Sequence, residues 1–176
     1  MTVFVDLKLL YPDAKRPEYQ TAGASGMDLH AYIPRAQGRQ PEALRIPALG
    51  RLLVGTGISL AVPTGYEGQV RPRSGWALSD GLTVLNSPGT IDSDYRGEVK
   101  VLLVNLGNSA VTIHTGERIA QLVIAPVVRA NLNGEPVAAP TEDEPNESDC
   151  ALRGGPHRAA ERKPRGDAGF GSTGKK

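Results

Sequence analysis

Acidic, aromatic and cationic side chains follow one another within residues 89–99, Gly-Thr-Ile-Asp-Ser-Asp-Tyr-Arg-Gly-Glu-Val. Aspartate and glycine both tolerate turn conformations, so the stretch from Asp94 to Arg96 predicts the turn of a β-hairpin. The alternating apolar residues that follow predict a strand with Val99 and Val101 on one side. The tip then carries a carboxylate, a ring that can stack and a cation. Such a tip suits the binding of a nucleotide and the activation of a water molecule.

A second group of residues suits phosphate. Arg73, Ser74 and Gly75 place a cation, a hydroxyl and an unhindered backbone amide side by side. Phosphate groups are bound by that combination, although an ordinary turn has the same composition. Asp28, at the start of a predicted strand, is explained by a turn when taken alone. Together with Asp92 and Asp94 it would suit a hard cation such as Mg²⁺.

The last residues of the chain are rich in glycine. Within residues 165–174, Arg165 precedes the pair Phe170 and Gly171. Successive glycine amides can surround phosphate oxygens and an arginine can add charge, while a plain Gly-rich tail explains the same composition. Residues 169–175 nearly match a P-loop, but the strand before it and the helix after it are not predicted. We therefore do not expect a Walker-type site.

The composition bounds the class of protein. A chain of 176 residues suits one domain, and with 5% aromatic residues its core must come from Val, Leu, Ile and Ala. The formal net charge of +1 gives no reason to expect a nucleic-acid or membrane partner. Neither a signal peptide nor an apolar run of ~18 residues is recognised, which predicts a cytoplasmic protein. The single cysteine and the scattered histidines predict neither a disulfide nor a zinc site.

Short apolar segments separated by glycine, proline and asparagine predict an all-β sandwich or barrel. Residues 52–62 contain Gly-Thr-Gly, which predicts two strand pieces joined by a glycine kink. Residues 74–79 are expected to form a short helical turn, and residues 34–41 a surface loop. The remaining expected strands are residues 3–9, 27–33, 66–70, 82–85, 98–105, 111–114 and 118–128.

The chain divides into three parts by composition. Residues 1–130 are predicted to form the β-barrel domain. Residues 131–164 contain an acidic run and then a basic run, with too few apolar residues to bury a core. That composition predicts a polar, disordered spacer. Residues 165–176 form the glycine-rich C-terminal arm.

The order of these motifs resembles that of the trimeric dUTPase family (deoxyuridine 5′-triphosphate nucleotidohydrolases), in which five motifs follow one sequence order. The resemblance implies a distorted antiparallel jelly-roll barrel, a C3 homotrimer with active sites between subunits, and a flexible C-terminal arm. It implies hydrolysis of dUTP to dUMP and pyrophosphate, which keeps uracil out of DNA and supplies dUMP for dTMP synthesis. The five counterparts are residues 24–29, 72–75, 86–97, 118–121 and 165–174.

The resemblance also implies roles in the reaction. Asp92 would be the general base for the attacking water. Because an aspartate is a weak base at neutral pH, it would act mainly by holding that water in line with the α-phosphorus. Mg²⁺ would bind the triphosphate oxygens, and Asp28 would contact it through water. The implied phosphate-binding residues are Arg73, Ser74, Gly75 and Gln121.

Recognition of the base and sugar is implied for the residues around the predicted hairpin. Tyr95 would stack on the deoxyribose and leave no room for a 2′-hydroxyl. A narrow pocket there would exclude cytosine by unpaired polar groups and thymine by its methyl group. The residues implied in uracil binding are Asn86 and the main chain around Thr90, Ile91 and Lys100.

The arm is implied to close over the bound nucleotide. Phe170 would stack over the uracil, with Gly171 beside it, and Arg165 would reach the γ-phosphate. Closure would exclude all water other than the nucleophile. Two departures from the family pattern are a longer spacer before the arm and an insertion at residues 38–44. Trp76 stands where the family usually has a smaller aliphatic residue, and we expect it at a subunit boundary.

Two other functions fit parts of the sequence. A deoxycytidine-triphosphate deaminase of similar architecture would need a glutamate acting on the cytosine ring, and Glu98 is the acid near the hairpin that suits it. A non-enzymatic nucleotide-binding module of the same fold would need neither a general base nor a metal-contacting acid. The presence of Asp28, Asp92 and Gln121 favours an enzyme over that module.

Overall fold

The computed structural model describes residues 2–34 and 43–132. Nearly all of the expected loop at 34–41, nearly all of the spacer at 131–164 and the whole arm lie outside the described residues, the arm including Arg165, Phe170 and Gly171. The described elements are β1 (Asp6–Leu9), β2 (Met27–His30), β3 (Leu44–Ile46), β4 (Arg51–Ala61), β5 (Tyr66–Arg71), α1 (Ser74–Ser79), β6 (Leu82–Val84), β7 (Gly89–Ile91), β8 (Glu98–Asn105), β9 (Val111–Ile113) and β10 (Arg118–Pro126).

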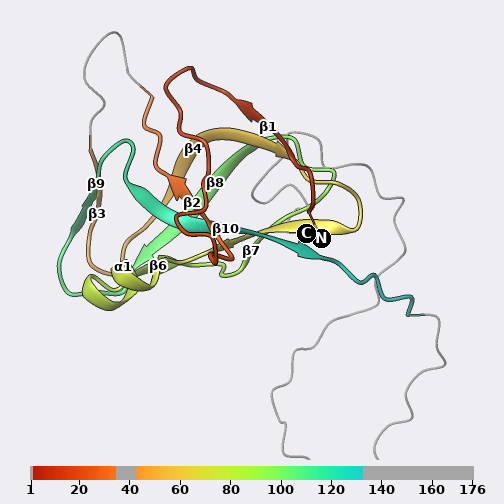
Figure 1. The fold of residues 1–176 in the computed structure, drawn as a ribbon. Coiled ribbons are helices and arrows are strands. Elements are labelled where there is room, and N and C mark those ends of the chain that lie inside the picture. Colours follow the sequence, from red (N-terminus) through yellow and green to blue (C-terminus); the bar gives the residue numbers. More distant parts are fainter. Residues whose placement is uncertain (1, 35–42, 133–176) are drawn as a thin grey trace, which may run out of the picture. The chain divides into compact units, whose positions relative to one another are not determined.

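Antiparallel pairing arranges the strands into two four-stranded sheets and one two-stranded ribbon (Figure 1). The strand orders are β1-β4-β8-β6, β2-β10-β5-β7 and β3-β9. The prediction of an all-β fold is thus confirmed, and the helical turn at Ser74–Ser79 lies where it was expected. The second sheet matters most for function, because β2 carries Asp28, β10 carries Gln121, and Arg73 follows two residues after β5 ends.

The core is built from aliphatic side chains, as the low aromatic content predicts. The buried cluster consists only of Leu, Ile, Val and Ala. Strand β8 shows how the pattern works: Val99 and Val101 are buried, whereas Lys100 between them is exposed. Burial of such side chains is the main favourable term in folding, at roughly 25 cal/mol per Å² of apolar surface.

The predicted β-hairpin at residues 89–99 is wrong. Strand β7 pairs with β5, whereas β8 pairs with β4 and β6, so the strands on either side of residues 92–97 lie in different sheets. Apolar alternation identifies the side of a strand that faces the core, but not the strand that will lie beside it. We call residues 92–97 the inter-sheet turn.

Strand β4 also differs from expectation. The two predicted pieces are one strand, Arg51–Ala61, and the glycines lie in an irregularity of its pairing with β8 between Gly55 and Ser59. A β-bulge of this kind bends a strand without ending it. Strand β3, with 3 residues, was not among the expected strands.

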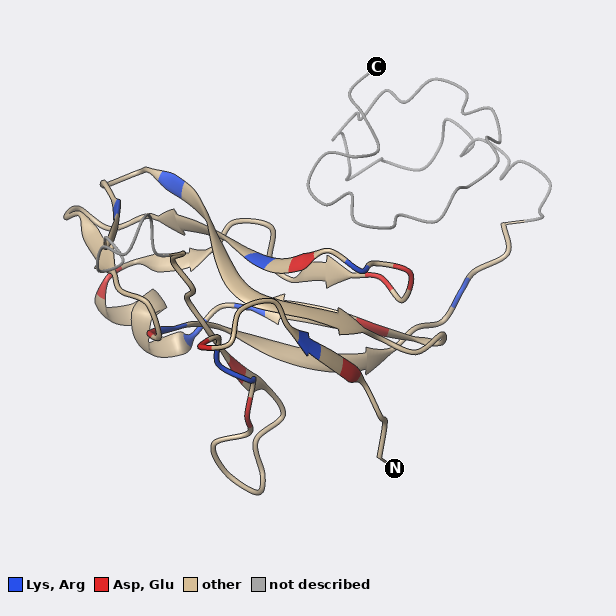
Figure 2. Cartoon of the chain, turned by 90° about the horizontal axis from the view of Figure 1, so that it is seen from above, with Lys and Arg blue, Asp and Glu red and all other residues tan. Residues whose placement is uncertain are grey.

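Acidic and basic side chains are interspersed along the described chain (Figure 2). Both signs occur on the strands and on the connections between them, in keeping with the formal net charge of +1. Within residues 2–34 and 43–132, no helix is long and apolar enough to cross a bilayer.

Candidate functional site

The candidate site is centred on a buried carboxylate, Asp28. It lies on β2 opposite Gln121 of β10, and Gln121 in turn lies opposite Arg71 of β5. The side chain of Asp28 is only 3% exposed. A buried charge is costly unless it is paired, so its neighbours decide whether this position is tolerated.

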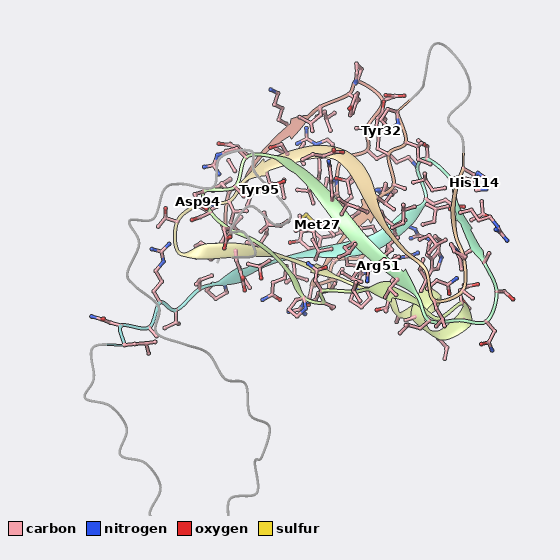
Figure 3. All side chains as sticks on the ribbon, turned by 180° about the vertical axis from the view of Figure 1, so that it is seen from behind. Met27, Tyr32, Arg51, Asp94, Tyr95 and His114 are labelled. Atoms are coloured by element: carbon pink, nitrogen blue, oxygen red, sulfur yellow. The ribbon has the colours of Figure 1, made fainter. Side chains whose placement is uncertain are left out.

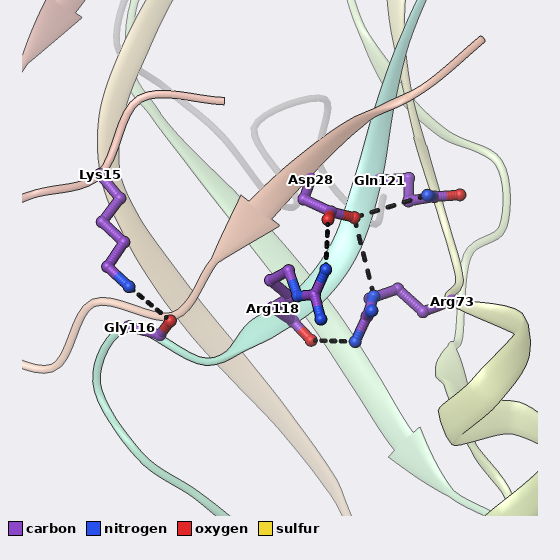
Figure 4. Close-up of polar contacts among 6 residues, drawn as sticks. All are labelled: Lys15, Asp28, Arg73, Gly116, Arg118 and Gln121. Atoms are coloured by element: carbon purple, nitrogen blue, oxygen red, sulfur yellow. Dashed lines mark hydrogen bonds and ion pairs between the residues drawn. The ribbon is translucent and has the colours of Figure 1, made fainter. Parts of the chain in front are cut away.

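Two guanidinium groups and one amide surround Asp28 (Figure 4). Nη1 of Arg118 lies 3.2 Å from Oδ2 of Asp28, and Nε of Arg73 lies 3.7 Å from Oδ1. Nε2 of Gln121 donates a 3.5 Å hydrogen bond to Oδ1. Arg73 also donates from Nη1 to the carbonyl oxygen of Arg118 over 3.1 Å. We call Asp28, Arg73, Arg118 and Gln121 the Asp28 cluster.

The contacts within the Asp28 cluster set the direction of the Arg73 and Arg118 guanidinium groups. Arg73 precedes α1 directly, and its side chain is 23% exposed, so part of the guanidinium remains accessible to a ligand. Ser74 and Gly75 begin α1 and are exposed, with open space around Gly75. Arginine offers several donors in a planar fork, which suits phosphate oxygens. The structure therefore brings together Asp28, Arg73 and Gln121, with Ser74 and Gly75 next to Arg73 in sequence.

An open cavity of about 480 Å³ lies beside the cluster. His30 is half-buried there, and its Nδ1 has no hydrogen-bond partner among the described residues. Burial, reinforced by the Lys15 ammonium group, lowers the pKa of His30 below 6.5. A neutral imidazole is therefore favoured next to the two arginines. The lining residues are Lys15, Gln20, His30, Arg73, Trp76, Gly116, Glu117 and Arg118.

The inter-sheet turn is held by bonds of its own. The amide of Tyr95 donates to the carbonyl oxygen of Asp92 over 3.1 Å, and the Tyr95 hydroxyl donates to the carbonyl oxygen of Glu98 over 2.9 Å. Nη1 of Arg96 donates to the carbonyl oxygens of Ser93 and Tyr95. Asp92 is half-buried at the start of this turn. The arginine at the tip thus stabilises the turn itself.

The residues implied in uracil binding flank this turn. Thr90 is exposed on β7 and Ile91 is buried. Asn86 lies in the connection before β7, and its amide lies close to Gly89. A Cβ added at Gly89 would lie 3.2 Å from Nδ2 of Asn86. On β8, Nζ of Lys100 lies 3.6 Å from Oε2 of Glu98.

The two halves of the predicted site lie apart within one chain. Asp94 and Tyr95 are at one end of the barrel, whereas α1, which follows Arg73, is at the other (Figures 1 and 3). One copy of the chain therefore does not bring Asp92 and Tyr95 to Arg73, which is predicted to bind phosphate.

Two residues of the site were missed from sequence. Arg118 was quoted in a motif but not as a site residue, although it makes the shortest ion pair to Asp28. Position 118 carried no short signal for this contact, because it depends on a register shift in the β2–β10 pairing between Arg118 and Ala120. His30 carried no sequence signal, since it becomes notable only through the cavity beside it.

The glutamate that a deaminase would need is engaged in the fold. Oε1 of Glu98 accepts a 2.9 Å hydrogen bond from the Gly57 amide, and its other oxygen faces Lys100. A carboxylate bound to the backbone of β4 is not available to act on a cytosine ring. The geometry of Glu98 therefore disfavours the deaminase alternative.

Solved structures identify the fold. A mutant dUTPase from phage phi11 of S. aureus, in which a structural Mg(II) ion is coordinated, matches with a TM-score of 0.64 at 20% identity, over 77% of this chain and 97% of that chain. A mutant Staphylococcus bacteriophage 80alpha dUTPase with dUpNHpp matches with a TM-score of 0.65 at 22% identity, over 78% and 98%. The fold is thus the jelly roll of the dUTPases.

Sequence comparisons identify the family. The dUTPase family model matches residues 13–147. The deoxyuridine 5′-triphosphate nucleotidohydrolase of Treponema pallidum is 55% identical over 121 residues, covering 69% of this chain and 79% of that protein. The one of Wolinella succinogenes is 45% identical over 171 residues, covering 97% and 94%. The chain therefore belongs to the dUTPase family and is an enzyme of that class.

Proposed function

We propose that this enzyme hydrolyses dUTP to dUMP and pyrophosphate, and so keeps uracil out of DNA and supplies dUMP for dTMP synthesis. The observation that carries the proposal is the Asp28 cluster, in which Arg118 pairs with Asp28 while Arg73 and the Gln121 amide remain beside it for phosphate, in a chain of the dUTPase family. The cluster explains why a nucleotide with several phosphates is bound. Selection of the deoxyuridine nucleotide falls to the residues around the inter-sheet turn.

The reaction is an in-line displacement at the α-phosphorus. Asp92 accepts a hydrogen bond from a water molecule and so directs the oxygen of that water towards the phosphorus. A bond forms between that oxygen and the α-phosphorus, the bond from the phosphorus to the bridging oxygen breaks, and pyrophosphate leaves with the electron pair. The proton of the water passes to Asp92 and then to solvent.

The phosphates are held by the other half of the site. The partly exposed guanidinium of Arg73 contacts phosphate oxygens, with the Ser74 hydroxyl, the Gly75 amide and the Gln121 amide beside it. Arg118 acts through Asp28: it neutralises the buried carboxylate, so that Arg73 keeps charge for the substrate. Oriented donors of this kind stabilise charge that develops during the reaction.

The separation of the two halves supports a site assembled between copies of the chain. Asp92 and Tyr95 of one copy would meet Arg73 and Gln121 of another, and a C3 homotrimer closes such a head-to-tail arrangement. This accounts for a chain in which Asp94 and Tyr95 lie at one end of the barrel and α1, which follows Arg73, lies at the other (Figures 1 and 3).

The donor set at Asp28 fits Mg²⁺ only as an ion carried by the substrate. No group of three or more His, Cys, Asp or Glu side chains within residues 2–34 and 43–132 is placed to hold a metal. The oxygens of Asp28 already contact Arg73, Arg118 and Gln121. Asp28 would contact the ion through its waters, which Mg²⁺ gives up reluctantly. When bound, the ion neutralises charge on the departing pyrophosphate.

Selection of base and sugar falls to the residues around the inter-sheet turn. The Asn86 amide and the main chain at Thr90, Ile91 and Lys100 bind the uracil edge. Tyr95 packs on the deoxyribose and excludes a 2′-hydroxyl. A site whose polar groups are paired only by uracil can reject a mismatched base by ~10⁴-fold.

The parts beyond the barrel complete the proposal. The arm at 165–176 closes over the substrate through Arg165, Phe170 and Gly171, and residues 131–164 connect it to the barrel domain of residues 1–130. We place the enzyme in the cytoplasm, with dUTP and other copies of itself as partners and neither nucleic acid nor a membrane among them.

The test is a pyrophosphate-release assay with dUTP, UTP, dTTP and dCTP on the full chain. We expect turnover of dUTP alone, at least ~100-fold above each of the others. Release of ammonia from dCTP would establish the deaminase instead. Binding of dUTP without release of pyrophosphate would establish a non-enzymatic module.

A further inference from the structure

The ladder between β4 and β8 is interrupted where the two glycines lie. Gly55 is opposite Lys100, and the next pair is Ser59 with Glu98, so three residues of β4 face Val99 alone. Gly57 in this bulge has a φ of +70°, and a Cβ there would lie 2.8 Å from the Cβ of Ala14. A bulge takes backbone groups out of the ladder, and other groups must then satisfy them.

Glu98 satisfies the bulge with its side chain. Oε1 of Glu98 accepts the hydrogen bond from the Gly57 amide at 2.9 Å, and the side chain is 20% exposed. A Cβ at Gly55 would lie 2.6 Å from the same oxygen, so glycine leaves the space that the carboxylate fills. The carboxylate of Glu98 is therefore built into β4.

The same residue supports the inter-sheet turn with its main chain. The Tyr95 hydroxyl donates to the carbonyl oxygen of Glu98 over 2.9 Å. Ser59, at the end of the bulge, donates from Oγ to the carbonyl oxygen of Arg96 over 2.7 Å. Two hydrogen bonds thus connect the bulge of β4 with the inter-sheet turn. One runs from Tyr95 to Glu98, whose carboxylate binds the bulge, and the other runs from Ser59 to Arg96.

We propose that Glu98 is a positioning residue that sets the place of the Tyr95 ring, and with it the discrimination between deoxyribose and ribose. The inference rests on the proposed function, in which that ring excludes the 2′-hydroxyl. What Glu98 supplies is a hydrogen-bond acceptor for the Gly57 amide. Its negative charge is not what the bulge requires, because the amide of a glutamine offers the same acceptor.

Removal of the acceptor leaves the Gly57 amide unpaired and loosens the bulge, so that the carbonyl oxygen of Glu98 no longer holds the Tyr95 hydroxyl in place. A displacement of about 1 Å at a substrate-positioning group costs on the order of 100-fold in rate. A ribonucleotide, which the ring normally excludes, would lose less than dUTP. The ratio of kcat/KM for dUTP to that for UTP therefore falls.

The experiment compares Glu98→Ala and Glu98→Gln with the unmodified full chain, using dUTP and UTP. We expect Glu98→Ala to lower the dUTP/UTP ratio by at least ~10-fold, and Glu98→Gln to stay within ~3-fold of the unmodified ratio. The matched control is Asn105→Ala, at the other end of β8. There the buried amide bonds the carbonyl oxygens of Ile46 and Ser109. It should lower the melting temperature and leave the ratio unchanged.

Ser59→Ala provides a second variant should Glu98→Ala not fold, and we expect a fall in the ratio of ~3-fold or more. An unchanged ratio in folded Glu98→Ala, or in Ser59→Ala when the former does not fold, overturns the inference. So does Glu98→Gln behaving like Glu98→Ala. An unmodified enzyme that turns over UTP as fast as dUTP overturns the proposed role of Tyr95, and that result is read before any variant.

Discussion

The carboxylate of Asp28 and the guanidinium of Arg118 form a bonded pair between β2 and β10. Oδ2 of Asp28 lies 3.2 Å from Nη1 of Arg118, and the Asp28 side chain is 3% exposed while that of Arg118 is 46% exposed. One charge is thus buried and the other is half in water. The ion pair therefore stabilises the buried Asp28 carboxylate more than it stabilises the half-exposed Arg118 guanidinium.

Arg118→Ala should therefore destabilise the fold, because it leaves the Asp28 carboxylate with Arg73 and Gln121 alone. We expect a loss of about 1–2 kcal/mol, since solvent screens an arginine that is half exposed. Urea unfolding at pH 7 measures the change. Arg51→Ala, which removes an exposed arginine from β4, is the control and should change stability by less than ~0.5 kcal/mol.

Asp92→Asn should keep dUTP binding and lose turnover. The amide preserves the size of the side chain but cannot take a proton from water, and loss of a general base costs on the order of 10²–10⁴-fold in rate. Calorimetric binding and single-turnover kinetics separate the two effects. Asp94→Asn, in the same turn, should retain most of the turnover. Unimpaired hydrolysis by Asp92→Asn would assign the base to another group.

Two inactive variants should complement each other when they are refolded together. In a trimer of Asp92→Asn and Arg73→Ala chains, some sites combine the intact Asp92 of one copy with the intact Arg73 of another. Random assembly into trimers makes about a quarter of the sites whole. The measurement is the activity of the mixture against each variant alone. No recovery, with mixed trimers shown by mass, would place both residues in one chain's site.

A chain that ends after Pro164 should assemble as the full chain does and lose most of its activity. The reason is that the arm at 165–176 is proposed to exclude water and to orient the triphosphate, and loss of such closure costs ~100-fold or more. Light scattering gives the assembly and the pyrophosphate assay the rate. Full activity of the shortened chain contradicts the role of Arg165 and Phe170.

Gly57→Ala should be more destabilising than Gly65→Ala. Both glycines have positive φ angles, +70° and +88°, so both variants carry the backbone cost of about 1–2 kcal/mol. Only Gly57 is also crowded: a Cβ there would lie 3.0 Å from the Tyr32 ring, whereas Gly65 faces open space. Thermal unfolding of the pair isolates the steric part. Equal losses would mean that the bulge relaxes around the new methyl group.

The sequence predicted much of the fold because local pattern and burial agree. The bounds of β8 and α1 match the expected residues 98–105 and 74–79. The alternation in β8 is a local signal. The hairpin failed for the opposite reason. Its error lay in pairing, and β7 chooses β5 through contacts made far along the chain.

The candidate site was likewise predicted only in part from the sequence. Asp28, Arg73 and Gln121 were predicted from motifs, and the structure brings them together: Asp28 and Gln121 lie on the neighbouring strands β2 and β10, and Arg73 lies between β5 and α1. The contact of Arg118 with Asp28 depends on a register shift in β10 that no short pattern encodes. In the proposed function, Asp92 and Tyr95 act with them through a second copy of the chain, and the sequence of one chain indicates such an assembly only through its resemblance to the family.

The placement of Asp94 and Tyr95 at one end of the barrel and of α1 at the other has a consequence for enzyme abundance (Figure 3). Under the proposed assembly of each site from two copies, catalytic output follows how often copies meet. Serial dilution of correctly folded protein would then lower its specific activity well before any unfolding is detected. In a cell that holds few copies of the enzyme, the reaction rate would fall more steeply than the number of copies.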